Sequence, residues 1–463
     1  MRVPLLVIGG GLSGIAAAIR AARFTPDVLL LEKHTRLGGL NSYFYRNKLL
    51  YETGLHAITN YAEPKDKRAP LNRLLRQLKI KRSQLSFCQQ YQSEILFHNC
   101  ETLTFSNDYQ LLESQITSKF PKSADKWREL LLFLEEFNPF SIVPFRSAKR
   151  FLLDRLNDPL LVEMILCPLM YYGSSCEDDM DLNQFAIMFQ AIYLEGMFRP
   201  QGSIKDFLDL LIAHLRSLGG HIRKNAGVKK IHNSRDCVTA VELESGEVIE
   251  CDNVVSTIGH LETLNLLDTN QQPQDKSAHR LGFIENIFQL PDSSTPRLPT
   301  DKTIIFYNKG ECFAYRQPET FADFASGVNC FPGNFQDFIK PPHREIRSTH
   351  LANYGLWRDI EKQREAYEKE KSRVSGQSLQ CLEEVVGEFG SSVTYSNCFT
   401  PVTIKRYTSK IDGAIYGSPV KIKDGDIGFS NLYLAGTDQG FLGIIGSMLS
   451  GVSIVNQHIL NRL

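Results

Sequence analysis

Residues 4–22 read PLLVIGGGLSGIAAAIRAA. An apolar run of strand character ends in a glycine cluster and continues at once into an alanine-rich helical pattern. Gly9, Gly11 and Gly14 have the spacing of the dinucleotide fingerprint. In that fingerprint the first glycine permits a tight turn, the second lets the backbone approach a pyrophosphate, and the third lets the helix pack against the strand. The stretch therefore predicts a Rossmann-like α/β unit.

A second apolar run, DVLLLEK at residues 27–33, ends in the acid Glu32. A carboxylate about 20 residues after the glycines accepts hydrogen bonds from the hydroxyls of an adenosine ribose. A carboxylate at this position disfavours the phosphorylated ribose of NADP. The diphosphate would lie on the free N–H groups around Leu12 and Ser13, where the helix macrodipole favours negative charge. These residues alone leave both NAD and FAD open.

Composition places the chain among globular proteins of ordinary charge. Its 463 residues are 42% hydrophobic and 22% charged, and Lys+Arg and Asp+Glu both total 52. The length allows two or three domains, and the zero net charge argues against a nucleic-acid partner. The ten cysteines form no C-x-x-C pair and no cluster of zinc-ligand spacing, so we expect reduced thiols and no metal site.

The chain shows no targeting or membrane-spanning pattern. The first strand is expected to start by residue 3, so we expect no secretory signal. No run of 18 apolar residues occurs, so we expect no spanning helix. The sequence predicts a cytoplasmic protein, with binding at the periphery of a membrane left open.

A glycine pair follows the ribose-binding acid and distinguishes the two cofactors. Lys33 follows Glu32, and after four more residues come Gly38 and Gly39, whose backbone amides can close over a diphosphate from the side opposite the first loop. NAD-only domains have no standing need for such a pair. This pattern resembles that of the flavin-containing amine oxidoreductase superfamily. The resemblance implies FAD as cofactor, with these residues and Leu40 in its site.

A short acidic and histidine-containing element comes next, within LLYETGLH at residues 49–56. It reads as a strand followed by a turn, and it resembles the superfamily's acid–x–Gly–x–His element near the flavin edge. His56 is therefore a candidate active-site group. A histidine satisfied within the core is the alternative for this residue.

Two long segments interrupt the nucleotide-binding pattern. Residues 71–197 are expected to be mainly helical, with a helical stretch at 124–156 and a break or kink at Pro168. Its apolar helices with basic flanks suit either a substrate tunnel that opens onto a bilayer or buried helices with solvated faces. Residues 261–399 are expected to contain strands at 303–307 and 312–315 and a charged helix at about 355–388.

The remaining segments predict a discontinuous architecture. We expect an FAD-binding domain of residues 1–70, 198–260 and 400–463, and a discontinuous α+β substrate-binding domain with a helical cap from the two interrupting segments. Within 198–260, an amphipathic helix precedes an alternating strand at 221–231 and a hairpin around Ser245-Gly246. By the superfamily resemblance, the backbone of Val228 contacts the adenine.

The C-terminal segment carries the second group of motifs. TPVTIKRY at 400–407 and DGAIYG at 412–417 resemble, in order, a signature of carotenoid desaturases, carotenoid isomerases and retinol saturases, and the wording after residue 436 looks most like the retinol-saturase branch. The segment from Gly436 reads as a strand end, a glycine turn and a helix start. Asp438 could accept a hydrogen bond from a ribityl hydroxyl of the flavin. The helix start around Ile445 could approach the flavin pyrimidine ring.

These patterns favour an FAD-dependent oxidoreductase acting on the carbon–carbon double bonds of an apolar, polyene or isoprenoid substrate. Saturation, desaturation and isomerisation all remain open. Arg406, Tyr407 and Tyr416 join His56 as candidate polar groups near the ring, with a purely structural role for the arginine and both tyrosines as the alternative. Two other functions compete on the same scaffold: an amine or amino-acid oxidase, and a non-catalytic lipid carrier that kept the flavin fold.

Overall fold

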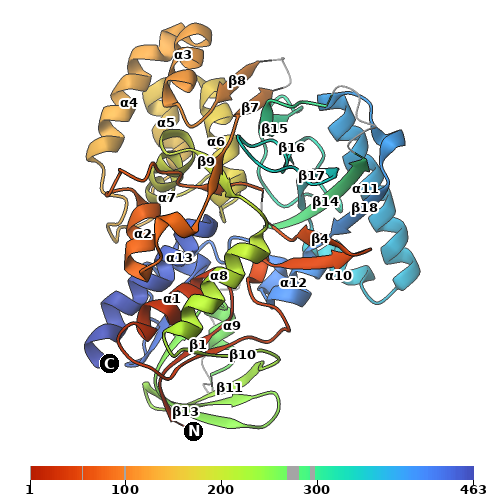
Figure 1. Cartoon of the computed structure of the whole chain (residues 1–463). Coiled ribbons are helices and arrows are strands. Elements are labelled where there is room, and N and C mark those ends of the chain that lie inside the picture. The colour runs from red at the N-terminus through yellow and green to blue at the C-terminus, as the bar shows by residue number, and fades with distance from the viewer. Residues whose placement is uncertain (1, 55, 98–100, 268–280, 292–297) are drawn as a thin grey trace.

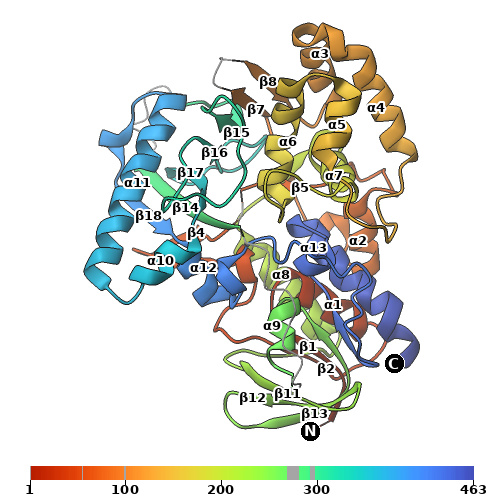
Figure 2. The same ribbon diagram turned by 180° about the vertical axis from the view of Figure 1, so that it is seen from behind.

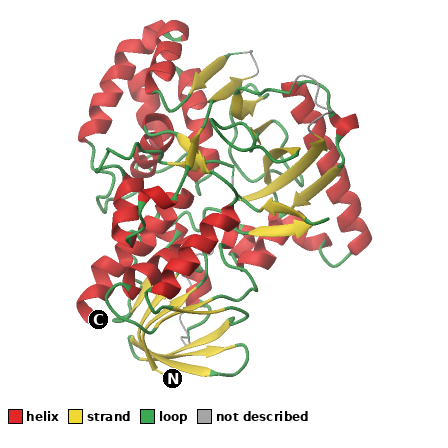
Figure 3. Ribbon diagram, in the orientation of Figure 1, coloured by secondary structure: helices red, strands yellow, loops and turns green. Residues whose placement is uncertain are grey.

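The computed structural model describes residues 2–54, 56–97, 101–267, 281–291 and 298–463 (Figure 1). Both chain ends lie in one lower part of the molecule, which is built around a sheet. Above it stand a helical part on one side and a second sheet with long helices on the other, as the opposite view also shows (Figure 2). Colouring by secondary structure shows that one upper part is mainly helical, whereas the other two regions combine strands with helices (Figure 3).

The first sheet has a parallel centre. Strand β1 pairs in parallel with β2 and β13, and the residues of these strands at the pairing are almost all buried, as expected where helices or strands cover both faces. An antiparallel β11–β12–β13 meander extends one side, and it contains the predicted hairpin. The order is β10 (His221–Arg223), β2 (Val28–Leu31), β1 (Arg2–Ile8), β13 (Val248–Ser256), β12 (Cys237–Leu243) and β11 (Val228–Ser234), with β19 (Leu432–Leu434) also paired to β13.

Helices α1 (Leu12–Ala22), α13 (Gly443–Ile454), α8 (Ile204–Ser217) and α2 (Pro70–Leu78) share one apolar core beside this sheet. Two glycines permit the close approach. A Cβ on Gly14 would lie 2.0 Å from the Gly9 carbonyl oxygen, and one on Gly451 would lie 2.1 Å from the Ser13 carbonyl oxygen. Because α2 packs with this core, the cofactor side of the chain continues past the predicted boundary at residue 70.

The second sheet is mainly antiparallel and draws its strands from residues 92–105 and 282–399. Only β7 and β15 pair in parallel in it. Helices α10 (Tyr354–Ile360) and α11 (Arg364–Val386) flank it, so the predicted helix at 355–388 is in fact interrupted near residue 361. The order is β18 (Tyr395–Phe399), β14 (Gly282–Pro291), β17 (His343–Ala352), β16 (Ser326–Cys330), β15 (Lys302–Asn308), β7 (Gln92–Phe97) and β8 (Thr102–Phe105).

The helical part corrects three local expectations. The stretch 124–156 forms two helices with an intervening loop, because its middle contains two prolines. Helix α6 continues through Pro168 without ending there, and its residues around that proline are fully buried. Residues 312–315 form no strand. The helices are α3 (Tyr109–Lys119), α4 (Ala124–Glu136), α5 (Ala148–Leu156), α6 (Pro159–Gly173) and α7 (Leu182–Phe189).

Short elements join these regions. They include the hairpin β3 (Tyr43–Arg46)–β4 (Leu49–Glu52), the small sheet β5 (Ile58–Thr59)–β9 (Met197–Pro200)–β6 (Phe87–Gln89), and helices α9 (His260–Leu264) and α12 (Pro401–Thr408). Among the described residues, one helical stretch, Gly443–Arg462, is long and apolar enough to cross a membrane by length and composition. Half of that stretch is buried inside the protein, where α13 packs against α1 and α2.

Candidate functional site

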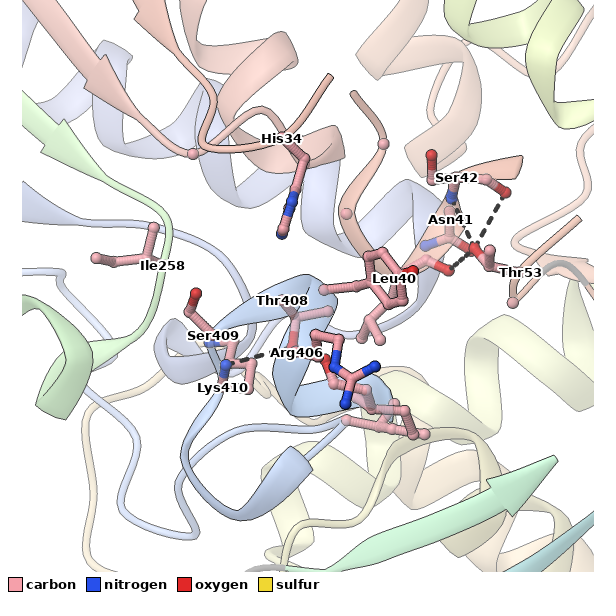
Figure 4. Close-up of a pocket in the computed structure, with 18 of the residues that line it drawn as sticks. His34, Leu40, Asn41, Ser42, Thr53, Ile258, Arg406, Thr408, Ser409 and Lys410 are labelled. Atoms are coloured by element: carbon pink, nitrogen blue, oxygen red, sulfur yellow. Dashed lines mark hydrogen bonds between the residues drawn. The ribbon is translucent and has the colours of Figure 1, made fainter. Parts of the chain in front are cut away.

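One large cavity of about 1160 Å³ runs from the β1–α1 loop to the second sheet. Its wall combines both glycine motifs, the C-terminal segment and residues of α6, β14 and β17. Figure 4 shows part of it, where His34, Ile258 and Arg406 come from three segments and border the same space. Backbone of the two glycine motifs lines one part of the cavity, and aromatic side chains line another.

The two glycine motifs lie side by side in the wall of this cavity and contact each other directly. Gly9 has a φ of +101°, which allows the turn that ends β1. The Gly38 N–H donates to the Gly10 carbonyl over 2.8 Å, and a Cβ on Gly39 would lie 3.3 Å from the Gly11 Cα. A Cβ on Gly11 would meet no atom within 4 Å, so it would project into open space. This is the cradle expected for a diphosphate that passes against the backbone.

Glu32 is fixed at the end of β2 with its carboxylate in the cavity wall. One oxygen accepts from the Gly10 N–H and the other from the His34 N–H, both over 2.8 Å. These two bonds hold the carboxylate in place and leave its other lone pairs for ribose hydroxyls. Lys33 and Val228 line the same end.

Unpartnered polar atoms test whether a dinucleotide fits here. Five buried side-chain atoms that belong to residues of the wall have no hydrogen-bond partner among the described residues: Ser13 Oγ, His34 Nε2, Tyr172 OH, Glu262 Oε2 and Thr437 Oγ1. Buried polar groups in native proteins are nearly always paired, so these atoms point to a ligand with several donors and acceptors. The first turn of α1 also lacks a side-chain cap at Gly11. The residues therefore fit FAD, from adenosine to flavin.

The C-terminal segment closes the far end of this space. Gly436, Thr437, Gly443 and Ile444 line it, together with Ser447 one turn into α13. Gly436 has a φ of +100° and Gly443 a φ of +71°, so glycine is required at both turns. The helix start predicted to approach the flavin does border the cavity.

The predicted role of Asp438 is wrong in this structure. Its side chain is 1% exposed and lies outside the cavity wall. One carboxylate oxygen accepts from the Ser418 N–H over 2.8 Å and the other from the His260 N–H over 2.7 Å. Burial would raise the pKa of this carboxyl, but Lys410, Lys421 and the two amides outweigh it and lower the pKa to about 2. Asp438 holds neighbouring loops together, and Thr437 faces the cavity in its place.

The predicted contact of Ile445 is also wrong by one position. Its side chain is 2% exposed and packs in the apolar core with Leu71, Leu74 and Met448. Ile444 faces the cavity instead. Neighbouring residues at a helix start point about 100° apart, so a sequence motif without a known helix phase does not settle which of them faces the ligand.

His56 lies in the cavity wall and forms a pair with Glu285 of β14. The His56 Nε2 is 2.8 Å and 2.9 Å from the two carboxylate oxygens, and the Thr349 hydroxyl donates to one of them over 2.9 Å. The His56 Nδ1 has no hydrogen bond among the described residues. Glu285 thereby fixes the ring with Nε2–H toward the carboxylate and Nδ1 unengaged.

Glu285 belongs to a buried network of charges. The fully buried Arg347 donates to Glu285 over 3.2 Å, to Glu345 over 2.6 Å and to the Glu52 carbonyl over 2.7 Å. Burial would raise the pKa of Glu285, but His56, Arg347 and Thr349 outweigh it and hold that pKa below its ordinary value. The Glu285 carboxyl is therefore ionised at neutral pH and its charge is compensated.

Arg406 and Tyr407 are not near the end of the cavity that His56 lines. The Arg406 side chain is 65% exposed and lies 3.4 Å from a Glu361 oxygen. Tyr407 is 61% exposed, and its ring centroid is 5.7 Å from that of His34, two residues after Glu32. Both border the cavity beside its adenosine end, so the prediction that they lie near the reactive ring is wrong.

Tyr416 does lie at the apolar end. Its hydroxyl donates to the Tyr171 carbonyl, and its ring meets Phe283 edge to face with centroids 5.9 Å apart. Burial raises the pKa of the Tyr416 hydroxyl above its ordinary value. Because that hydroxyl is already bonded to the protein, Tyr416 shapes the wall.

The sequence prediction missed several residues of this wall: Tyr171, Tyr172, Phe283, Glu285 and Thr349. All lie in the two interrupting segments. One signal was present, because Glu285 is the one charged residue in GFIENIFQLP, the sequence of the buried strand β14. A buried acid in a strand needs a partner, and here the partners come from β17 and from residue 56.

The fold and this cavity together define a class: a dinucleotide-binding oxidoreductase with a separate substrate-binding sheet. The family description "Flavin containing amine oxidoreductase" matches residues 12–283, more than half of the chain. The chain belongs to the flavin-containing amine oxidoreductase family, and its cofactor is FAD. The prediction of FAD made from the paired glycines is confirmed.

Three curated relatives have names that refer to carotenoids or to retinol. A 4,4'-diaponeurosporene oxygenase of Staphylococcus aureus is 24% identical over 89% of this chain and 87% of its own length. An all-trans-retinol 13,14-reductase of Danio rerio is 22% identical over 99% and 86%. A lycopene-forming phytoene desaturase of Pseudescherichia vulneris is 24% identical over 57% of each chain. The predicted resemblance to this branch is confirmed.

Solved structures support the fold. An oxidoreductase from Methanosarcina mazei has a TM-score of 0.69 at 15% identity, covering 98% of this chain and 100% of its own. A putrescine oxidase variant has a TM-score of 0.66 at 13% identity over 100% and 99%. A Rab GDI from Plasmodium falciparum has a TM-score of 0.56 at 10% identity over 98% of each chain. At these identities the likeness concerns the fold alone, and it confirms the predicted fold class.

Proposed function

We propose that this protein is an FAD-dependent oxidoreductase that acts on carbon–carbon double bonds of an extended apolar substrate of polyene or isoprenoid type. FAD, when bound, supplies the hydride donor or acceptor at N5. The protein's own residues bind and orient the substrate, exclude water, and take up or release the proton.

The observation that carries this proposal is the composition of the cavity beyond the glycine motifs. Aromatic and aliphatic side chains dominate there: Phe44, Tyr171, Phe283, Val328, Ile415 and Tyr416. Tyr171, Phe283 and Val328 are each less than 5% exposed, so this wall belongs to the packed core. Such a surface favours a long hydrocarbon through burial of apolar area and offers few groups to a polar one.

His56 is the proposed proton carrier at this wall. Glu285 accepts the Nε2–H and thereby directs Nδ1 away from the carboxylate, where it can take up or release a proton. Glu285 is a positioning residue in this scheme. Its bonds to Arg347 and Thr349 keep it in place whichever way the proton moves at Nδ1.

An anaerobic experiment tests the proposal. The FAD-loaded protein is mixed with a polyene in the oxidised state, and separately with the same polyene after photoreduction. Loss of the visible flavin band in the first arm supports desaturation, and its return in the second supports saturation. A change in the geometry of the polyene without net change in the flavin supports isomerisation. No spectral or product change with any of a set of polyenes of different length would refute the proposal.

An amine oxidase is the second candidate, and the fold of putrescine oxidase is the observation that favours it. An ammonium substrate would need an uncompensated carboxylate or an aromatic cage near the ring. Glu285 is the acid of this wall, and Arg347 and His56 already engage it. Hydrogen peroxide formation with a panel of amines would favour this candidate over the polyene reaction.

A non-catalytic carrier is the third candidate, favoured by the likeness to Rab GDI. The complete glycine cradle and the unpartnered polar atoms around it argue for retained FAD binding, which a carrier does not require. Protein that takes up no FAD, or whose flavin responds to no substrate while apolar ligands still bind, would support the carrier.

A further inference from the structure

The loop of residues 137–147 connects α4 to α5 on the helical part (Figures 1 and 2). It exposes several large apolar side chains. Phe140 is 63% exposed, Ile142 72%, Val143 40% and Phe145 55%. Most other exposed large apolar residues among the described ones lie singly along the chain. Single exposures need no explanation, but a cluster on one loop indicates an interaction surface.

The backbone of the 137–147 loop is fixed to the rest of the protein. The Asn183 side-chain amide donates to the Ser141 carbonyl over 2.9 Å, and the Leu182 N–H donates to the Arg146 carbonyl over 2.8 Å. The Phe140 ring stacks on Phe441 with centroids 6.0 Å apart. Because these contacts hold the loop, its apolar side chains are presented outward on a stable support.

Basic residues follow the apolar side chains of this loop, and the exposed acids Glu135 and Glu136 precede the loop at the end of α4. Arg146, Lys149 and Arg150 are the charged residues between positions 137 and 153. The side chains of Arg146 and Arg150 are exposed and have no partner among the described residues. The nearby Asp181 is used inside the fold, where it caps α7 by accepting from the Asn183 N–H over 2.9 Å. Apolar tips with free cations beside them match an anionic lipid surface.

We propose that the 137–147 loop inserts into the surface of a bilayer that contains anionic phospholipids. Arg146 and Arg150 would contact the headgroups, while Phe140, Ile142 and Phe145 would enter the upper acyl region. The stacking partner Phe441 lies two residues before Gly443, which lines the cavity. Binding would therefore hold one wall of the cavity next to the membrane, where an apolar substrate dissolves. The membrane contact itself does not depend on the proposed reaction.

Co-sedimentation with vesicles tests the proposal. FAD-loaded protein is spun with vesicles of phosphatidylcholine alone and with vesicles that also contain phosphatidylglycerol. We expect binding to the anionic vesicles, a loss of about tenfold or more for the double variant Phe140→Ser/Ile142→Ser, and a smaller, salt-sensitive loss for Arg146→Gln/Arg150→Gln. Equal flavin content in each variant shows that it has folded.

Ile339→Ser is the matched control, because Ile339 is 77% exposed and lies elsewhere in the chain. It should bind vesicles like the unmodified protein. The proposal fails if Phe140→Ser/Ile142→Ser binds as well as the unmodified protein, or if Ile339→Ser loses as much. It also fails if the unmodified protein does not bind the anionic vesicles. In that case, a dimer in light scattering that the double variant converts to a monomer would assign the loop to self-association.

Discussion

The two ends of the cavity are built in different ways. The cofactor end is formed largely by backbone from residues 9–14 and 36–42, and its key side chain, Glu32, lies between them. The apolar end is formed by side chains from α6, β14, β17 and the segment around residue 416, far apart in the sequence. A backbone cradle leaves no room for an added atom where backbone or cofactor lies against it, whereas side-chain walls tolerate exchange of similar residues. Variants at the two ends should therefore fail in different ways.

The largest effect is expected at Gly14. Its Cβ would lie 2.0 Å from the Gly9 carbonyl oxygen, so Gly14→Ala must separate α1 from β1 and should destabilise the protein by about 3 kcal/mol. Chemical denaturation of the apoprotein measures this. Gly11→Ala is the matched variant: its Cβ meets no protein atom within 4 Å. It should leave stability nearly unchanged and weaken FAD binding. Equal stability loss in both variants would contradict the cradle.

At the apolar end, His56→Gln should lower kcat about 100-fold, the lower range for loss of a general acid or base. The glutamine amide can still donate to Glu285, so FAD content and stability should change little. The dependence of kcat on pH should also change its shape in this variant. The loss of a purely structural contact would leave that shape unchanged. Full activity in His56→Gln would contradict the proposed proton carrier.

Asp438→Asn tests whether the Asp438 carboxylate holds the neighbouring loops together or binds the cofactor. Its pKa of about 2 lies below the ordinary value of 3.8, so it stabilises the folded state fully above pH 3.8 and less as the pH falls towards 2. Asp438→Asn should cost about 2 kcal/mol at pH 7, and the difference should fall to about half near pH 3. Denaturation at several pH values measures this. The exposed Asp426→Asn is the control, and a large loss of FAD affinity without loss of stability would restore the cofactor role.

The smallest effect is expected at Arg406. Its side chain is 65% exposed and its nearest acid, Glu361, is 37% exposed, so the pair contributes little in water. Arg406→Ala should leave kcat within about twofold and stability within about 0.5 kcal/mol. Steady-state kinetics with the polyene measures the first. A drop in kcat comparable to that of His56→Gln would place Arg406 in the reaction.

Local motifs were predicted well because each depends on neighbours in sequence. The turn at Gly9, the helix start at Gly11 and the acid at Glu32 all follow from one strand–turn–helix unit. The prediction failed where the rotation of a residue around its helix, or its burial, decides which side chain faces the cavity and where a helix ends. Ile444 rather than Ile445 faces the cavity, and the helix around Pro168 continues because the surrounding core holds it. Arg406 lies in a family motif, but the packing of α12 leaves its side chain exposed to solvent.

The sequence by itself determined the fold class, the cofactor and the position of the diphosphate cradle, because glycine spacing and an acid at a strand end act over a few residues. Only the tertiary structure decided what surrounds the reactive end. Glu285 of β14 contacts His56, and Arg347 and Thr349 of β17 bond to Glu285, an arrangement that depends on sheet register. The exposed cluster at 137–147 likewise required the fold, because exposure depends on what packs against a residue.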